Sequence, residues 1–422
     1  MTEVLGSELP AGARFIEPAV GDEPGWRDGR AAPTPSDLDT CVACGLCLPH
    51  CPTYRLLGEE SQSPRGRIAA MRAVSQGVAE PDRTFASFMD ACLVCRACED
   101  VCPSHAPFGR MMEAAREQIE PTRGPISRLM RWLGFHWILP HPTAIRGLAV
   151  LQPLARPFMP AHVRALITGS AHPFARLPRV TDPSAFEVRG TVALLSGCAQ
   201  DRWFHEVNLA TIRVLAATGW RVEVPRDQAC CGALAAHNGR LAVARRLARR
   251  AAHAFAGAEV VVVNAAGCSA HMKTLEEIQP GTGLPVHDLM AFLAERGLGQ
   301  AELRPIEVTV AYHDACHASR AQGIRTEPRE VLSQIPGLRI LEIPEGDRCC
   351  GAAGTYNLTQ PEMSGALRDE KAEAVAATGA TILASANPGC SMQIAAGLRA
   401  AGATAIEVVH PIQMLDRALA DS

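Results

Sequence analysis

The sequence lacks the marks of a membrane-spanning or nucleic-acid-binding protein. Its 422 residues contain no uncharged apolar run of eighteen residues, which excludes a transmembrane helix and leaves only peripheral membrane contact. A net charge of −3 and the absence of a helix-turn-helix or zinc-finger signature disfavour nucleic acid as a partner. The start, MTEVLGSELPAGARF, lacks the basic and apolar segments of a signal peptide, so we expect a cytoplasmic chain with reduced thiols.

The motifs of a substrate-converting enzyme are also missing. No GxGxxG is present, and the nearest glycine pair, in GTGLP at 281, runs into Pro285, so a nicotinamide or flavin fold is not indicated. His313, Asp314 and His317 cluster around a cysteine and are better interpreted as groups that orient thiolates than as an acid–base set. We assign no catalytic residue and expect substrate chemistry to belong to another polypeptide.

Cysteine, by contrast, is abundant: the sixteen cysteines form four sets of four. Two sets are contiguous and read CxxCxxCxxxCP, namely CVACGLCLPHCP at 41 and CLVCRACEDVCP at 92. Three cysteines on one tight loop reach three irons of a cubane [4Fe-4S] cluster, and in two-cluster ferredoxins the fourth ligates the other cluster. The predicted ligand sets are Cys41, Cys44, Cys47 and Cys102 for cluster 1, and Cys92, Cys95, Cys98 and Cys51 for cluster 2.

Other uses of these two motifs are disfavoured. A zinc site takes four ligands, usually in separated pairs, and has no need of a third cysteine followed by CP. Disulfides are disfavoured because a reducing compartment keeps thiols free for metal.

The layout of the chain predicts five segments. Residues 1–34 are rich in Gly, Pro and charge and are typical of a flexible or loosely docked arm. Residues 35–120 should form an α-helical domain that carries both cluster loops, with a helix capped by Ser63 and stopped at Gly77. Residues 121–185 should form a basic amphipathic connector. The rest should be two α/β domains, 186–300 and 301–422.

The connector has an unusual composition. Between residues 121 and 180 there are eight arginines and no Asp or Glu, interleaved with large apolar residues such as Trp132 and Trp137. Such a segment lies on an anionic membrane surface or packs into a partner subunit. Its apolar face packing on its own domains is an equally weighted alternative.

The C-terminal part is an internal duplication. TVALLSGCAQ at 191 matches VTVAYHDACH at 308, CCGALAAHNG at 230 matches CCGAAGTYNL at 349, and VVVNAAGCSAHM at 261 matches ILASANPGCSMQ at 382. In each copy short β-type runs alternate with longer helical ones, which predicts a parallel sheet covered by helices. We expect the two α/β domains to be related by a pseudo-two-fold axis.

Each copy carries four more cysteines, which follow β-type runs. Parallel sheets gather ligands at the carboxyl ends of their strands, so these thiols should meet. The Cys-Cys-Gly triplets indicate a turn aimed at a metal, with Gly232 and Gly351 letting the backbone bend. The sets are Cys198, Cys230, Cys231 and Cys268 in the first copy, and Cys316, Cys349, Cys350 and Cys390 in the second.

This arrangement resembles the cysteine-rich CCG domain, which occurs in pairs in heterodisulfide reductases, in anaerobic glycerol-3-phosphate dehydrogenases and in glycolate oxidase. In the fullest form of that motif the last cysteine begins a CxxC, but here the fifth positions hold His271 and Gln393. His271 either replaces the thiol as a ligand to iron or zinc or is merely packed. The second copy is either a packing or docking element or a weaker metal site.

From about Thr40 to the C-terminus the chain resembles the iron–sulfur subunit of glycolate oxidase. The runs TYRLLGEESQSPRGRI at 53 and CCGAAGTYNL at 349 carry the resemblance, together with the order of the duplicated motifs. In that family a flavoprotein subunit oxidises glycolate to glyoxylate, and the iron–sulfur subunit passes the electrons to a quinone or another acceptor. The resemblance implies an electron-carrying subunit of an oxidoreductase complex with two [4Fe-4S] clusters, in the cytoplasm or at the cytoplasmic face of the inner membrane.

Three alternatives stay open. The same architecture serves the oxidation of glycerol-3-phosphate and D-lactate, because the substrate site lies in a different polypeptide. A thiol–disulfide enzyme of the heterodisulfide reductase type is a more distant alternative, against which the missing fifth cysteines count. A third alternative is a redox sensor or scaffold without its own reaction.

Overall fold

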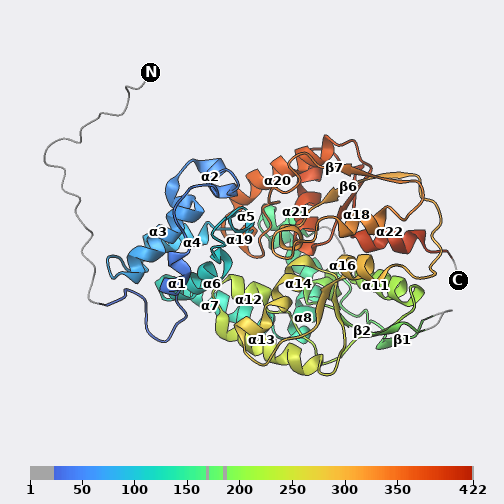
Figure 1. The fold of residues 1–422 in the computed structure, drawn as a ribbon, viewed down its shortest axis with the longest axis horizontal. Coiled ribbons are helices and arrows are strands. Elements are labelled where there is room, and N and C mark those ends of the chain that lie inside the picture. Colours follow the sequence, from blue (N-terminus) through green and yellow to red (C-terminus); the bar gives the residue numbers. More distant parts are fainter. Residues whose placement is uncertain (1–22, 168–170, 184–187, 421–422) are drawn as a thin grey trace, which may run out of the picture.

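The structure, a computed structural model, describes residues 23–167, 171–183 and 188–420. Figure 1 shows a helical part, coloured blue to cyan, at one end of the long axis and two α/β parts side by side at the other end. The predicted α/β fold class is confirmed, since a helical N-terminal part precedes two separate, mainly parallel sheets.

The N-terminal part is built from short helices around a core of methionines. Ser63 accepts a hydrogen bond from the Gly66 amide, and Gly77 follows the helix at φ 70°, which confirms the predicted cap and stop. Met71, Met89 and Met111 are fully buried between the helices. The elements are α1 (Pro35–Asp39), α2 (Pro52–Leu57), η1 (Glu60–Gln62), α3 (Pro64–Ser75), α4 (Arg83–Asp90), α5 (Ala97–Asp100), α6 (Phe108–Gln118) and η2 (Glu120–Thr122).

The arm expected at residues 1–34 is described only from residue 23 onward, and residues 1–22 lie outside the described residues. Residues 23–34 lie against the N-terminal helices. The ring of Trp26 meets the ring of Phe85 edge-on at 5.9 Å, and the Arg27 amide donates to Gln118 Oε1 at 2.7 Å.

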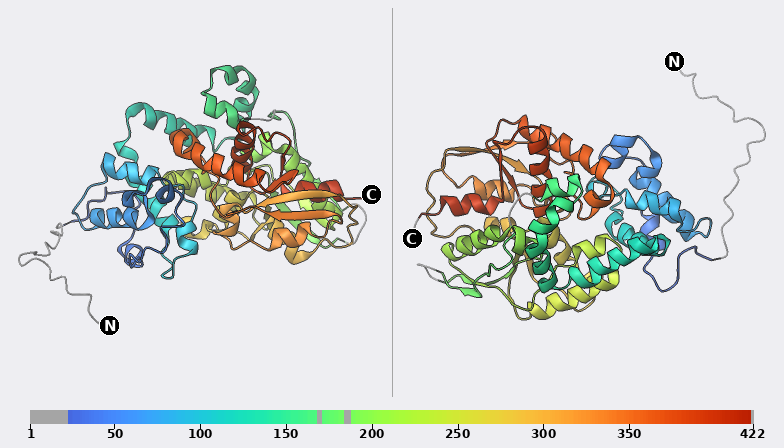
Figure 2. Two further views of the ribbon diagram at one scale, coloured as in Figure 1. Left: turned by 90° about the horizontal axis from the view of Figure 1, so that it is seen from above. Right: turned by 180° about the vertical axis from the view of Figure 1, so that it is seen from behind.

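The connector crosses one face of the two α/β parts (Figure 2). Phe135 and Ile145 are buried against those parts, whereas Ile126, Leu154 and Phe158 are exposed, Phe158 at 89%. Among the described helices, none has the length and apolar character that crossing a bilayer requires. The elements are α7 (Pro125–Trp132), the π-helix η3 (Leu133–Ile138), α8 (Pro142–Ala155), η4 (Arg156–Phe158) and α9 (Ala161–Leu166).

The first copy contains a five-stranded sheet of order β1-β3-β2-β4-β5, parallel except for the short edge strand β1. The buried residues of its central strands β2 and β4 are Val, Ala and Leu, as expected for a sheet covered on both faces. The strands are β1 (Val180–Thr181), β2 (Gly190–Leu195), β3 (Trp220–Glu223), β4 (Val261–Val263) and β5 (Val286–Asp288). The helices are α10 (Ala199–Trp203), α11 (His205–Ala217), α12 (Ala233–His237), α13 (Leu241–Ala254), α14 (Ala266–Lys273), α15 (Leu275–Ile278) and α16 (Leu289–Arg296).

The second copy repeats this order as β7-β6-β8-β9, with all strands parallel. The second helix of each copy packs on the last helix of the other, α11 on α22 and α18 on α16, as a pseudo-two-fold relation requires. The strands are β6 (Val308–His313), β7 (Leu338–Glu342), β8 (Ile382–Ser385) and β9 (Glu407–Val409). The helices are α17 (Cys316–Ser319), α18 (Glu327–Leu332), α19 (Tyr356–Thr359), α20 (Pro361–Ala376), α21 (Pro388–Ala400) and α22 (Pro411–Ala418).

Candidate functional site

The first cysteine loop, residues 41–47, curls around a small cavity. Its backbone turns through the left-handed region at Ala43 (φ 56°) and Gly45 (φ 85°), which gives the tight curl that three converging thiols need. We call this cavity the first cluster cavity. Its wall holds Cys41, Cys44 and Cys47 from the loop, and Cys98 and Cys102 from the second motif.

The second loop, residues 92–98, repeats this curl around a second cluster cavity. Val94 (φ 52°) and Arg96 (φ 61°) occupy the positions of Ala43 and Gly45. A β-branched residue in this region is strained, and such strain is typical of functional sites. The cavity is lined by Cys92, Cys95, Cys98 and Cys51. The structure therefore brings together both crossed sets, while ligation itself stays a prediction.

Two buried arginines show whether an anionic cluster fits the second cavity, namely Arg67, which lines it, and Arg116, which lies behind Cys92 and lines the cysteine cavity. Arg67 is 1% exposed and donates to neutral groups, among them the Phe88 carbonyl, the Thr53 hydroxyl and the Gln62 side-chain carbonyl. Arg116 is also buried, and its guanidinium donates to backbone carbonyls, among them that of Cys92. Within the described residues neither arginine forms an ion pair. A buried cation without a counter-charge is costly, so the donor set fits a negatively charged occupant held by thiolates.

The two loops differ in exposure. In the first loop Cys44 is exposed, and its neighbours Val42 and Leu46 are 68% and 56% exposed. In the second cavity Cys51, Cys92 and Cys95 are all buried. The first loop therefore faces outward, and the second lies between the N-terminal part and the α/β copies.

The cysteine set of the first copy converges as expected from its strand ends. The Sγ atoms of Cys198 and Cys230 are 3.5 Å apart, and those of Cys231 and Cys268 are 3.1 Å apart. Gly232 has φ 98°, and its counterpart Gly351 in the second copy has φ 81°, which confirms that the turn needs glycine.

Both cysteine sets face one shared cavity of about 310 Å³, which we call the cysteine cavity. The sequence predicted one set per copy but gave no sign that the sets face each other. Cys92 of the second loop also lines this cavity, and Cys95 packs in one apolar cluster with Cys349. The second loop therefore adjoins the duplicated part directly. The lining cysteines of the copies are Cys198, Cys230, Cys231, Cys268, Cys316, Cys349, Cys350 and Cys390.

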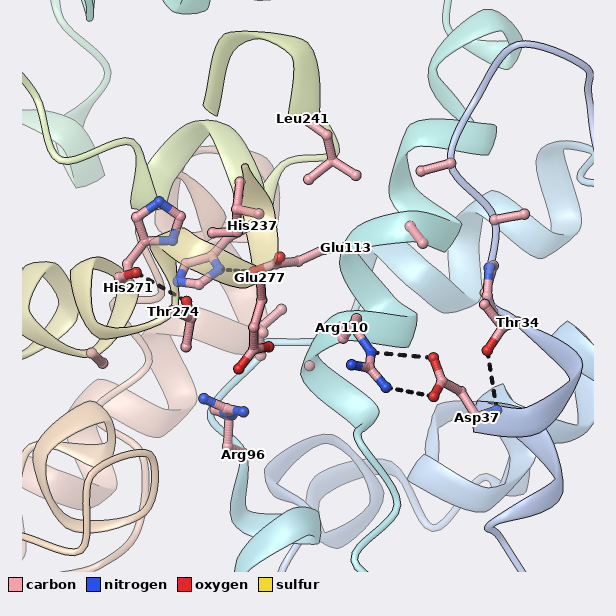
Figure 3. A pocket seen from close by; sticks show the side chains of 18 of the residues that line it. Thr34, Asp37, Arg96, Arg110, Glu113, His237, Leu241, His271, Thr274 and Glu277 are labelled. Carbon is pink, nitrogen blue, oxygen red and sulfur yellow. Dashed lines mark hydrogen bonds and ion pairs between the residues drawn. The ribbon is translucent and has the colours of Figure 1, made fainter. Parts of the chain in front are cut away.

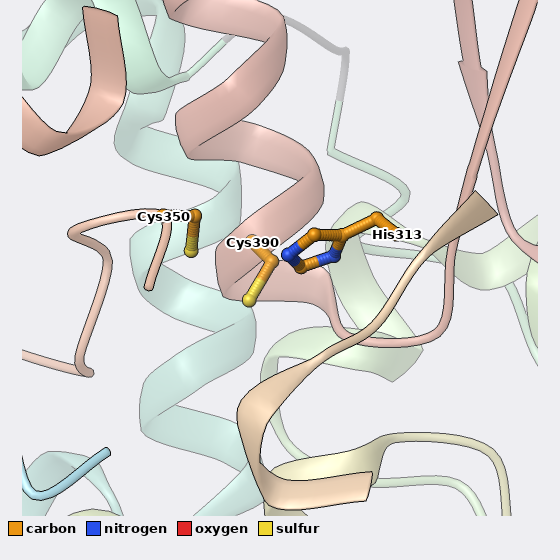
Figure 4. A group of neighbouring side chains, drawn as sticks. All are labelled: His313, Cys350 and Cys390. Atoms are coloured by element: carbon orange, nitrogen blue, oxygen red, sulfur yellow. The ribbon is translucent and has the colours of Figure 1, made fainter. Parts of the chain in front are cut away.

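His313 was missed as a candidate ligand. The sequence gave it only an orienting role, but a ring nitrogen and the Sγ atoms of Cys350 and Cys390 lie within 4.8 Å of one another (Figure 4). A hydrogen bond between His313 Nδ1 and Ser385 Oγ at 3.0 Å holds the ring. Burial lowers the pKa of His313 to about 3, which keeps the imidazole in the neutral form that ligates metals. The sequence feature that could have identified His313 as a candidate ligand is its position at the end of the β-type run VTVAYH.

Comparison with known proteins agrees with this geometry. A model of the 4Fe-4S dicluster domain matches residues 37–106, and a model of a cysteine-rich domain, CCG, matches residues 192–273 and 310–395. Over 415 residues the chain is 34% identical to the probable glycolate oxidase iron–sulfur subunit of Bacillus subtilis, covering 90% of this chain and 93% of that protein. The chain belongs to the glycolate oxidase iron–sulfur subunit family.

Other relatives define the range of the family. The chain is 32% identical over 409 residues to the glycolate oxidase iron–sulfur subunit of Escherichia coli, covering 93% of this chain and 97% of that protein. A fumarate reductase (CoM/CoB) subunit of Methanothermobacter marburgensis is 27% identical, with coverage of 91% of this chain and 73% of that protein. Membership of the glycolate oxidase family makes this chain an electron-carrying iron–sulfur subunit of an oxidoreductase, as the sequence indicated.

The two residues at the fifth positions of the CCG motif differ in their surroundings. Gln393 Nε2 donates to the carbonyl and the hydroxyl of Ser364 at 3.0 and 2.8 Å, which holds this side chain in place, while its buried Oε1 has no partner among the described residues. His271 is 4% exposed, and its buried Nε2 has no partner among the described residues. That nitrogen faces Gly232, the residue after Cys231. Burial lowers the pKa of His271, so the imidazole is neutral.

A His271→Ala variant is expected to contain less iron or zinc per chain than the wild type, because an unpartnered neutral imidazole beside Cys231 is suited to a metal. Metal analysis of the purified chain measures this. The His271→Cys variant, which restores CxxC, should keep the metal, and Gln393→Ala serves as the matched control. Unaltered metal in His271→Ala would leave His271 as a packing residue.

A polar pocket of about 530 Å³ lies beside the second loop (Figure 3). Glu113 Oε1 is 2.7 Å from His237 Nδ1, and although burial raises the pKa of Glu113, its hydrogen bond with His237 lowers it overall. The rings of His237 and His317 are 5.2 Å apart, and both residues also line the cysteine cavity. These two histidines therefore form the wall between the pocket and the cysteine cavity. The sequence gave no sign of His237 or Glu113.

Proposed function

We propose that the chain is the electron-transfer subunit of a glycolate-oxidising complex. In this proposal a partner flavoprotein oxidises glycolate to glyoxylate, and a quinone or another acceptor takes up the electrons. The named relatives in Bacillus subtilis and Escherichia coli support the substrate. The observation that carries the electron-transfer role is the series of adjoining cysteine sites, in which Pro64, Cys98 and Phe108 border both cluster cavities and Cys92 borders the cysteine cavity.

In this proposal the chain holds two [4Fe-4S] clusters. A cluster bound by four thiolates would supply reversible one-electron transfer. The two tightly curled cysteine loops hold the thiolates in place. Pro64, Leu93 and Phe108 line the second cavity and exclude water from it. The proposed ligands are Cys41, Cys44, Cys47 and Cys102 in the first cavity, and Cys92, Cys95, Cys98 and Cys51 in the second.

The partner flavoprotein is proposed to dock on the first loop. Cys44 is exposed there, and Val42 and Leu46 form an apolar surface next to it. Desolvated apolar residues at the centre of an interface carry much of its binding energy. Electrons would then enter at the exposed loop and leave from the inner sites.

Anaerobic addition of glycolate to the chain purified with its flavoprotein partner should reduce the clusters, as seen by EPR. A Leu46→Glu variant should slow this reduction roughly tenfold or more, because a charge in the docking surface costs binding energy. Val180→Glu, at the sheet edge of the first copy, is the control with an unchanged rate. Loaded clusters that glycolate does not reduce would refute the substrate, and an unaffected Leu46→Glu would refute the docking site.

The remaining assignments are proposals of the same kind. We propose that the first copy holds an iron–sulfur or zinc site through Cys198, Cys230, Cys231, Cys268 and His271, and that the second copy holds a weaker site. The grouping of His313 with Cys350 and Cys390 supports the latter. The exposed apolar and basic connector supports peripheral contact with the inner face of the membrane. The proposed domains are 35–120, 186–300 and 301–422, joined by the connector 121–185.

A second candidate is the same subunit serving another hydroxylated substrate. Lactate utilization protein A of Oceanobacillus iheyensis is 30% identical over 236 residues, covering 53% of this chain and 96% of that protein. The reduction assay distinguishes the candidates when D-lactate and glycerol-3-phosphate are tested beside glycolate. Thiol–disulfide chemistry is less well supported, because Gln393 is engaged with Ser364 where that chemistry has a cysteine.

A further inference from the structure

Three of the four cysteines that line the second cluster cavity each lie next to a different arginine. Arg67 Nη1 lies 4.0 Å from Cys51 Sγ, and Arg320 Nη1 lies 4.0 Å from Cys95 Sγ. Arg116 Nη2 donates to the Cys92 carbonyl at 2.5 Å. These three guanidinium groups come from α3, α6 and the loop after α17, and the tertiary fold brings each of them beside a cysteine of this cavity. Arg67 lines the cavity itself, whereas Arg116 lines the neighbouring cysteine cavity.

The positive charge around this cavity is only partly balanced by carboxylates. Arg67 and Arg116 have no ion pair within the part of the chain that the structure describes. Arg320 pairs with Asp347 at 3.0 Å, but Asp347 is half exposed while the side chain of Arg320 is 4% exposed. The nearby acids are occupied by other arginines: Asp90 by Arg123, Glu99 by Arg96, and Asp100 by Arg325.

The first cluster cavity has no such shell among the described residues. Arg65 is paired with Glu60 at 2.6 Å and is partly exposed. Arg72 is only half-buried and donates to the carbonyls of Leu38 and Cys41. Solvent next to the exposed Cys44 screens whatever charge remains there.

We propose that Arg67, Arg116 and Arg320 are the fixed counter-charges of the second cluster and raise its reduction potential. The proposal rests on the two-cluster assignment. Burial alone opposes the addition of an electron to an anionic cluster, because a low-dielectric site solvates the extra charge poorly. Fixed cations at this distance act in the opposite direction, and they act strongly because little water screens them. They keep the buried cluster reducible and favour movement of electrons inward from the exposed loop.

Arg320 gives the arrangement a second consequence. Its guanidinium interacts electrostatically with Cys316 of the second copy as well as with Cys95. The same charge therefore lies at the contact between the second loop and the second copy, 4.0 Å from Cys95 Sγ. A positive group at this position lowers the barrier that a fully buried, uncompensated site would present.

The test is a redox titration of the purified full chain, followed by the EPR signal of each cluster. Replacing any one of the three arginines by Gln is expected to lower the midpoint potential of the second cluster by the equivalent of a roughly tenfold change in its reduced-to-oxidised ratio, about 59 mV for one electron. The corresponding Lys variants, which keep the charge, should retain most of the wild-type potential. Arg72→Gln is the matched control and should leave the midpoint potential of the second cluster unchanged.

Arg320→Gln is the variant least expected to disturb folding, because the ion-pair partner that it leaves behind, Asp347, is half exposed to solvent. It keeps the test decisive even where Arg67→Gln or Arg116→Gln fails to fold. An unchanged potential of the second cluster in Arg320→Gln would overturn the proposal, as would Lys variants that shift the potential as far as the Gln variants. Wild-type chain that contains no iron or acid-labile sulfide would instead refute the cluster assignment.

Discussion

A Cys51→Ser variant is expected to lose the cluster of the second loop, although Cys51 belongs to the first motif. The reason is geometric, since Cys51 lines the second cluster cavity with Cys92, Cys95 and Cys98 and does not line the first. Iron should fall by about four atoms per chain, since each cubane contains four irons. Quantified iron and sulfide, together with EPR of the reduced protein, measure this loss.

The reciprocal variant provides the control. Cys102→Ser should remove the signal of the first loop, because Cys102 lies on the wall of the first cavity. Cys44→Ser should affect that same signal, since Cys44 is a member of the first loop itself. A Cys51→Ser variant that loses only the first-loop signal would show that each motif ligates its own cluster.

Removal of the clusters by anaerobic chelation is expected to destabilise the N-terminal part strongly. Arg67 and Arg116 then remain as buried cations with no ion-pair partner among the described residues. Removing one partner of a buried charge pair costs about 3–5 kcal/mol, and in small metal-binding domains metal binding is coupled to folding. Thermal unfolding can be followed by the fluorescence of Trp26, which packs on Phe85 inside this part, once the other tryptophans are replaced.

An Arg67→Met variant isolates the contribution of charge, because its effect should change sign between the two states. In the loaded protein the substitution removes a favourable charge and should lower the unfolding temperature. In the cluster-free protein it removes an unpaired buried cation and should raise the unfolding temperature above that of the cluster-free wild type. A lower temperature in both states would mean that Arg67 acts through its packing and hydrogen bonds alone.

The sequence by itself determined those features that depend on local spacing. The two CxxCxxCxxxCP runs place three thiols on one loop and aim the fourth away, so the crossed grouping followed before any tertiary contact was known. Ser63 and Gly77 marked the ends of α3 because capping depends on a few neighbouring residues. Repeated motifs with alternating β and α patterns predicted two parallel sheets, since such patterns reflect which faces are buried.

Only the tertiary structure decided how these parts face one another. The cysteine sets of the two copies share one cavity, His313 joins Cys350 and Cys390, Arg67 lines the second cluster cavity, and Arg116 reaches the Cys92 carbonyl beside it. None of these contacts has a signature at fixed spacing, because each joins residues far apart in the chain, within one part of the fold or, for the shared cavity, between the two copies. The sequence supplied the cysteines, and the packing of distant segments against one another determined the charge and the surroundings of these cysteines.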